Sequence, residues 1–281
     1  MERNRYRGED PRERVAAALI TLEQGIDGIL DSQAFAEYLA TMAKFHHYSF
    51  GNVLLIKLQA PAATWVAGYQ RWKQLGRQVR LGEKGIKILV PHAIRTTDAE
   101  TGEEQVIVRS FGLGTVFDIG QTEGQPLPEP PVAQEIRQAT DAGAALYTHL
   151  ERFLAAQGIT VTPEELDRGH GYYAPTERRI AIGRHLTGDQ QTKTLAHEAA
   201  HAVADHRGDT RREDAETVAE SAAFVVLHHY GIDTSSYTFP YVAGWAQNRQ
   251  VVRRNLEAIQ RTAHALIAGI EGPGDEERGT S

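Results

Sequence analysis

The sequence of 281 residues predicts an α+β protein built from two domains. Residues 11–59 place apolar side chains at helical spacing, and residues 65–118 contain short β-rich runs bounded by glycines. The stretch "GQPLPEPP" then interrupts both patterns with the composition of a linker. We expect an N-terminal domain of helices with a small sheet and a C-terminal, mainly helical domain with a small sheet. The predicted limits are 1–123 for the first domain, 124–131 for the linker, 132–270 for the second domain and 271–281 for a disordered tail.

The first half predicts three helices followed by strands. "RERVAAALITLEQGI" has helical periodicity, and "SQAFAEYLATMAKF" begins at Ser32, a favourable N-cap residue. A third helix, "SFGNVLLIKLQ", ends before Pro61 because the residue preceding a proline avoids helical geometry. The three runs "KGIKILVP", "EQVIVRSFG" and "GTVFDIG" predict strands.

The second half predicts a helix over residues 132–157, a strand in "RRIAI" and then two long helices. A further helix is expected within residues 241–268. The helix signals are the capping-box pairs Thr187 with Gln190 and Thr210 with Glu213, and the terminal glycines Gly208 and Gly231.

Composition excludes several classes of protein. Hydrophobic residues make up 41% and charged residues 24% of the chain, as in a globular protein. No apolar run is long enough to span a membrane, and the charged N-terminus does not resemble a secretory signal. The chain has no cysteine, so a metal would have to be bound by His, Asp or Glu. We expect a cytoplasmic protein with no membrane partner.

The segment "LAHEAAHAVADH" carries the strongest chemical signal. His197 and His201 are four residues apart, so both imidazoles lie on one face of a helix and can bind one metal ion. Glu198 is offset by one residue and points beside that ion, which suits a general base acting on water. The alternative is a plain helix surface, since the spacing also arises by chance. We interpret two further histidines, His206 and His228, as surface or core residues.

A catalytic zinc site usually needs a third protein ligand, and the next helix offers glutamates on one stripe. We assign Glu216 as that ligand and keep Glu213 as the alternative. Glu220, one turn further, would accept a hydrogen bond from a ligand histidine. Two histidines and one carboxylate favour Zn²⁺, with Mn²⁺ also compatible.

Longer stretches resemble a known family over both halves of the chain. "HEAAH", "ESAAFVV" and "GIDTSSYTFPYVAGWA" resemble the C-terminal zincin-like metallopeptidase domain of the ArdC antirestriction family. "YSFGNVLLIKLQAP", "VAGYQRWKQLGRQVRLGEKGIKILVP" and "VFDIGQTEG" resemble its N-terminal single-stranded-DNA-binding domain. The resemblance implies a plasmid- or phage-associated protein that protects incoming DNA from restriction. This chain departs from the family at Val218, where many relatives have a further acidic residue.

The first half also has the composition of a single-strand binder, although the formal net charge of the chain is −7. Residues 57–95 contain eight basic residues and one acidic residue. A single strand needs cations for its phosphates and flat rings for its bases. The predicted DNA-binding residues are Tyr69, Trp72, Lys73, Arg77, Arg80, Lys84 and Lys87, with Trp65, Tyr48 and Asn52 as further candidates. The alternative is that the aromatic residues belong to the core and the cations to a solvated face.

Three functions are compatible with these patterns. The first is a zinc metallopeptidase tethered to single-stranded DNA, in which Glu198 is the base and an unknown protein is the substrate. In that mechanism Tyr237 or Tyr241 is a candidate donor to the oxyanion, although a structural role suits both tyrosines better. The second is a protein that coats DNA and has a structural zinc, and the third is a peptidase that cleaves a regulatory protein.

Overall fold

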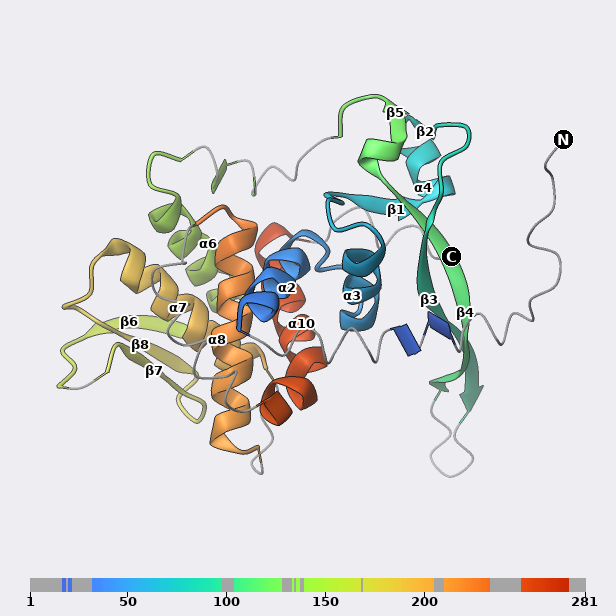
Figure 1. Cartoon of the computed structure of the whole chain (residues 1–281). Helices are drawn as coiled ribbons and strands as arrows, with labels where there is room; N and C mark the ends of the chain where they lie inside the picture. The colour runs from blue at the N-terminus through green and yellow to red at the C-terminus, as the bar shows by residue number, and fades with distance from the viewer. Residues whose placement is uncertain are drawn as a thin grey trace, which may run out of the picture. The chain divides into compact units, whose positions relative to one another are not determined.

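The computed structural model describes residues 17–18, 20–21, 32–97, 104–127, 133, 135–136, 139–167, 169–204, 210–232 and 249–272. Mixed helices and small sheets in two compact units confirm the predicted α+β class (Figure 1). One unit contains the described parts of Met1–Gly28 together with Gly51–Leu127, and the other contains the described parts of Ile29–Phe50 and Pro128–Ser281. The change of unit after Leu127 falls inside the predicted linker, but residues 29–50 join the second unit rather than the first.

The first unit is built on a long antiparallel hairpin. Strands β3 (Ile86–Thr97) and β4 (Glu104–Asp118) pair along their lengths, and the short β1 (Val66–Gly68) pairs with the end of β4. We predicted a break between two strands near Gly112, and this was wrong because β4 runs through it. A Cβ at Gly114 would lie 2.6 Å from Cγ2 of Val90, so this glycine permits close cross-strand packing instead of ending the strand.

Helix α3 (Phe50–Gln59), which the sequence predicted, is joined to β3 through two side-chain amides. Asn52 donates to the carbonyl of Leu89 and accepts from its N–H, both at 2.8 Å. Gln59 pairs with the backbone of Lys87 in the same way, at 2.8 and 2.9 Å. Asn52 is buried and uses its amide on β3, so our suggestion that it lines a DNA groove was wrong.

The first unit also contains a small subdomain formed by a short helix, two short strands and a 3₁₀ turn. Helix α4 (Tyr69–Gln74) leads into β2 (Arg77–Val79), which pairs with β5 (Thr122–Gly124) after the 3₁₀ turn η1 (Ile119–Gln121). Trp72 is fully buried against Ala67 and Val79, and its indole N–H donates to the carbonyl of Phe117 at 2.9 Å.

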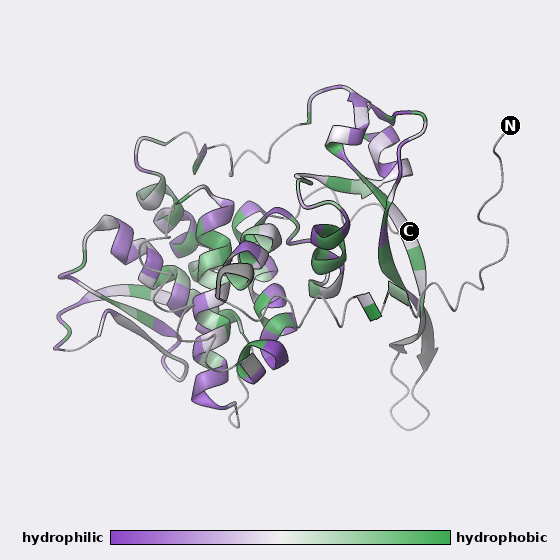
Figure 2. Cartoon of the chain, in the orientation of Figure 1, coloured by the Kyte–Doolittle hydropathy of each residue, from purple (hydrophilic) through white to green (hydrophobic). Residues whose placement is uncertain are grey.

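The second unit consists of helices with a three-stranded sheet. Its helices are α2 (Ser32–Lys44), α6 (Ala142–Ala156), α7 (Gly188–Val203), α8 (Arg212–His229) and α10 (Arg249–Glu271). The strands β6 (Thr160–Glu164), β7 (Gly171–Ala174) and β8 (Arg179–Gly183) lie in the order β6-β8-β7, with β6 parallel and β7 antiparallel to β8. Hydrophobic residues concentrate along the helices in the middle of this unit (Figure 2).

Several helix ends differ from the predicted ones. Asp141 caps α6 by accepting from the N–H of Ala144, so this helix begins later than the predicted residue 132. Thr187 is the N-cap of α7 as predicted, but its side chain makes no capping hydrogen bond. The N-cap of α8 is Arg211 rather than Thr210, and Gly231, at φ 78°, follows the end of α8 as predicted.

Two further predictions concern a membrane-spanning helix and the C-terminal part of the chain. None of them combines the length and the apolar character that crossing a membrane requires. The C-terminal helix is present as α10 and continues to Glu271, which the sequence had assigned to the disordered tail. Residues 273–281 and the tyrosines Tyr237 and Tyr241 lie outside the described residues.

Candidate metal centre

Helices α7 and α8 lie side by side and supply all the predicted metal-site residues (Figure 1). His197, Glu198 and His201 lie in the last two turns of α7, and Glu216 lies in the second turn of α8. Small residues such as Ala196, Ala199 and Ala200 are fully buried in α7, which lets neighbouring elements approach the backbone closely.

The three predicted ligands converge. Nε2 of His197 lies 3.1 Å from Nε2 of His201 and 3.5 Å from Oε2 of Glu216, and Nε2 of His201 lies 3.7 Å from the same oxygen. Two ligand atoms at about 2.0–2.1 Å from one tetrahedral ion are themselves about 3.3 Å apart. The observed separations therefore fit a single divalent ion held by these residues.

Glu220 orients one of these ligands. Its Oε2 lies 3.0 Å from Nδ1 of His197, and its Oε1 lies 2.9 Å from Nζ of Lys193. A carboxylate only accepts, so it holds the proton of His197 on Nδ1 and leaves Nε2 with a lone pair for a metal. Burial works to raise the pKa of Glu220, but its contacts with His197 and Lys193 outweigh burial and lower that pKa.

Glu198 has the environment of a general base. Its side chain is buried, and burial raises the pKa of its carboxyl group above the ordinary value. The backbone N–H of Tyr173 on β7 donates to this carboxylate and fixes it beside the two histidines. A carboxyl group with a raised pKa is better able to accept a proton from water near neutral pH.

Charge is strongly coupled among the ligands. Burial acts to lower the pKa of His197, but hydrogen bonds with Glu216 and Glu220 outweigh it and raise this pKa to about 9 in the absence of a metal ion, so an ion that binds Nε2 would displace a proton from it. The same histidine and His201 hold the pKa of Glu216 well below its ordinary value. The carboxylate of Glu216 is therefore ionised and available as a metal ligand.

The alternative third ligand lies elsewhere. Oε1 of Glu213 lies 2.7 Å from a guanidinium nitrogen of Arg254, on α10. Glu216 rather than Glu213 faces the histidines, although its role as a ligand stays a prediction. Of the two neighbouring histidines, His206 lies outside the described residues, and His228 is exposed near the end of α8.

Lys193 was missed by our sequence analysis. It lies four residues before His197, hence on the same face of α7, and this spacing was readable from the sequence. The backbone contact from Tyr173 was not readable, since it depends on where β7 packs against α7.

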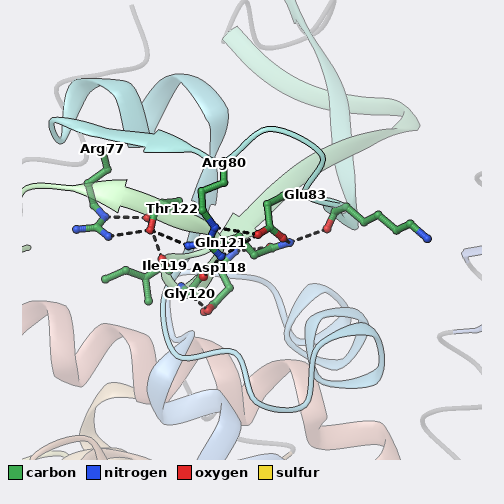
Figure 3. A network of polar contacts seen from close by, with 9 residues as sticks. Arg77, Arg80, Glu83, Asp118, Ile119, Gly120, Gln121 and Thr122 are labelled. Atoms are coloured by element: carbon green, nitrogen blue, oxygen red, sulfur yellow. Dashed lines mark hydrogen bonds and ion pairs between the residues drawn. The ribbon is translucent and has the colours of Figure 1, made fainter. Parts of the chain in front are cut away.

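The predicted DNA-binding residues separate into three groups. Trp72 was a wrong choice, because a fully buried ring cannot stack on a base. Arg77 and Arg80 form hydrogen bonds within the small subdomain of α4, β2, η1 and β5. Arg77 donates to Thr122, and Arg80 donates to Glu83 and to the carbonyl of Gly120 (Figure 3).

The remaining predicted residues are accessible to a ligand. Tyr69, at 44% exposure, and the side chains of Lys73 and Lys84 are exposed, while Lys87 is partly exposed and donates to Thr115. Trp65, at 37% exposure, adds a second available ring.

Comparison with known proteins agrees with the resemblance over both halves. The family model of the N-terminal domain of anti-restriction factor ArdC matches residues 10–117. The IrrE N-terminal-like domain, a peptidase M78 family model, matches residues 154–239.

Two curated proteins are similar to this chain at low sequence identity. An uncharacterized protein of Bacillus anthracis is 27% identical over 82% of this chain and 46% of its own length. The uncharacterized protein y4eC of Sinorhizobium fredii (strain NBRC 101917 / NGR234) is 31% identical over 56% of this chain and 52% of its own length. The chain thus spans about half the length of these curated relatives.

Two solved structures of the antirestriction protein ArdC from plasmid R388 are also similar. The metal-free structure has 27% identity and a TM-score of 0.46, covering 78% of this chain and 84% of that one. The Mn(II)-bound structure has 22% identity and a TM-score of 0.43, covering 80% and 85%. The two family models confirm the predicted recognition: residues 10–117 match the N-terminal domain of anti-restriction factor ArdC, and residues 154–239 match the IrrE-like domain of peptidase family M78.

Proposed function

We propose that this protein is an antirestriction factor that binds single-stranded DNA through its first unit and hydrolyses peptide bonds at a divalent-metal site in its second. The observation that carries the proposal is the convergence of His197, His201 and Glu216, with the buried carboxyl group of Glu198 beside them. The two family models support the pairing of a DNA-associated domain with a peptidase-like domain.

The residues around the ion would divide the reaction among them. A bound Zn²⁺ or Mn²⁺ would activate water for attack and polarise the scissile carbonyl. Glu198 would take a proton from the attacking water and later give it to the leaving nitrogen. Glu220 would keep His197 in the tautomer that presents Nε2, and Lys193 would keep Glu220 ionised.

The first unit retains a surface suited to a single strand after the buried tryptophan is set aside. Tyr69 and Trp65 offer accessible rings for base stacking, and Lys73 and Lys84 offer cations for phosphates. Such contacts do not depend on sequence, so binding would be non-specific and would weaken as salt is added.

The substitution Glu198→Gln tests the enzymatic part. It preserves size and keeps all three metal ligands, but it removes the base. We expect the metal content to be unchanged and both peptide hydrolysis and protection of incoming DNA in a conjugation assay to be lost. Glu257→Gln, at an exposed position of α10, is the matched control and should behave as wild type.

The same variant separates the other two functions. Full protection by Glu198→Gln would refute a role for hydrolysis and leave a DNA-coating protein with a structural metal. If a Lys73→Ala/Lys84→Ala variant lost DNA binding but kept full protection that still required Glu198, a peptidase that cleaves a regulatory protein would be favoured instead.

A further inference from the structure

A second group of metal-binding side chains lies in the same unit, outside the site formed by α7 and α8. It contains His46 in the turn after α2, His229 in the last turn of α8 and Glu271 at the end of α10. One ligand atom from each of the three lies within 4.8 Å of the other two, a limit that His197, His201 and Glu216 also satisfy. Both groups thus offer two imidazoles and one carboxylate.

The hydrogen bonds of His229 resemble those of a metal ligand. Its Nδ1 lies 2.9 Å from the carbonyl oxygen of Ala43, and its Nε2 lies 2.9 Å from Oε1 of Glu271. The carbonyl oxygen only accepts, so Nδ1 carries a proton, and a neutral ring then directs the lone pair of Nε2 at a carboxylate. That arrangement requires a cation, supplied either by a second proton on the ring or by a metal ion.

The first site offers an internal comparison. There His197 donates from Nδ1 to Glu220 and presents Nε2 to the position of the ion. At His229 the carbonyl of Ala43 takes the place of Glu220, and backbone carbonyls are common partners of metal-bound histidines.

The turn that carries His46 is held in place by α10. Nε2 of Gln260 donates to the carbonyl oxygens of His46 and Tyr48, each at 2.6 Å. The ring of His46 is buried and meets the ring of His229 edge-on, with ring centroids 4.9 Å apart. The turn and the neighbouring ring together hold this imidazole beside the other two ligands.

His46 also belongs to a second group of histidines, together with His47 and His264. Nδ1 of His46 lies 3.4 Å from Nδ1 of His264, and His47 completes a group with these two. His47 is exposed, whereas the side chains of His229 and Glu271 are only 12% and 11% exposed. Enclosure and the carboxylate both favour the set with Glu271, because a carboxylate offsets the charge of a divalent ion.

We propose that His46, His229 and Glu271 bind one divalent transition-metal ion, which joins the turn after α2 to the ends of α8 and α10. Two histidines and one carboxylate favour Zn²⁺. The enclosure of the ligands suits a structural ion rather than a catalytic one. This site does not depend on the proposed hydrolysis.

Metal content tests the proposal. We expect wild-type protein dialysed against Zn²⁺ to retain about two ions per chain by elemental analysis, and His197→Gln/His201→Gln to retain about one. In that background, His229→Gln or Glu271→Gln should remove the remaining ion. His228→Gln, one residue before His229 but outside the cluster, is the matched control and should keep the ion.

Several outcomes would overturn the proposal. A folded His197→Gln/His201→Gln protein that retains no Zn²⁺ would show that the cluster is an ion pair of His229 and Glu271. Loss of the ion with His264→Gln but not with Glu271→Gln would place it in the other group. Should the cluster variants fail to fold, the melting temperature of His197→Gln/His201→Gln should still rise with Zn²⁺ and fall with chelator, and should do so equally in a His197→Gln/His201→Gln/His264→Gln protein; no response to Zn²⁺, or loss of the response with His264→Gln, would refute the proposal.

Discussion

Replacing Glu220 by glutamine tests whether the residues behind the metal ligands set the affinity for the ion. Glu220 is 6% exposed, and its carboxylate accepts from Nδ1 of His197 at 3.0 Å. Loss of one charge-assisted hydrogen bond costs about 1.5–3 kcal/mol. At about 1.4 kcal/mol for each tenfold change, this loss predicts metal binding that is roughly 10- to 100-fold weaker. Substitutions behind the ligands of other metal sites weaken binding by about the same factor.

The assay is a competitive titration of Zn²⁺ against a chelating dye, with circular dichroism to confirm that the variant is folded. Lys193→Met should weaken binding less, because Lys193 reaches the metal only through Glu220 and its side chain is 25% exposed. The exposed Glu257→Gln serves as the reference for a change of charge alone. An affinity of Glu220→Gln within about twofold of wild type would refute the idea that Glu220 orients His197.

Four further changes test the first unit. Trp72→Ala should lower the free energy of unfolding by about 3–5 kcal/mol in urea denaturation, because it empties a fully buried site, and a decrease below about 1 kcal/mol would contradict that packing. Trp65→Ala, at an exposed ring, should leave stability nearly unchanged but weaken single-strand binding in fluorescence anisotropy; unchanged affinity would remove this ring from the DNA surface. The double variant Lys73→Ala/Lys84→Ala should reduce the slope of log affinity against log salt concentration by roughly 0.7 for each phosphate that the protein no longer neutralises. An unchanged slope would show that neither lysine contacts a phosphate. Asn52→Ala should destabilise the protein by about 2 kcal/mol, because it leaves a buried backbone N–H and carbonyl of β3 without partners, whereas a neutral effect would mean that water replaces the amide.

The sequence predicted the features that depend on spacing along one helix. His197 and His201 are four residues apart, and regular helix geometry alone brings their rings together. Glu216 lies on a different helix, and its selection over Glu213 used the stripe of glutamates and the resemblance rather than any contact. In the structure Glu216 lies beside both histidines, whereas Glu213 lies beside Arg254.

Other features depend on packing that one sequence does not reveal. Tyr69 and Trp72 are three residues apart in an aromatic, basic stretch, yet Tyr69 is exposed and Trp72 is buried. Composition cannot assign such rings to a core or to a surface. His46, His229 and Glu271 are even less predictable, because more than 180 residues separate the first from the second and no local spacing relates them.

Helix α2 has a practical consequence for dissecting the protein. It precedes Gly51–Leu127 in the chain, yet it belongs to the second unit and contacts α8. Its side chains Phe35, Leu39 and Met42 are buried. The second unit is therefore discontinuous in sequence, because Gly51–Leu127 is inserted between two of its segments. A truncation that starts after Leu127 would lack a helix of the body it is meant to isolate and would leave an apolar strip of α8 facing solvent. A fragment meant to isolate the second unit therefore has to keep residues 29–50 together with the part of the chain after Leu127.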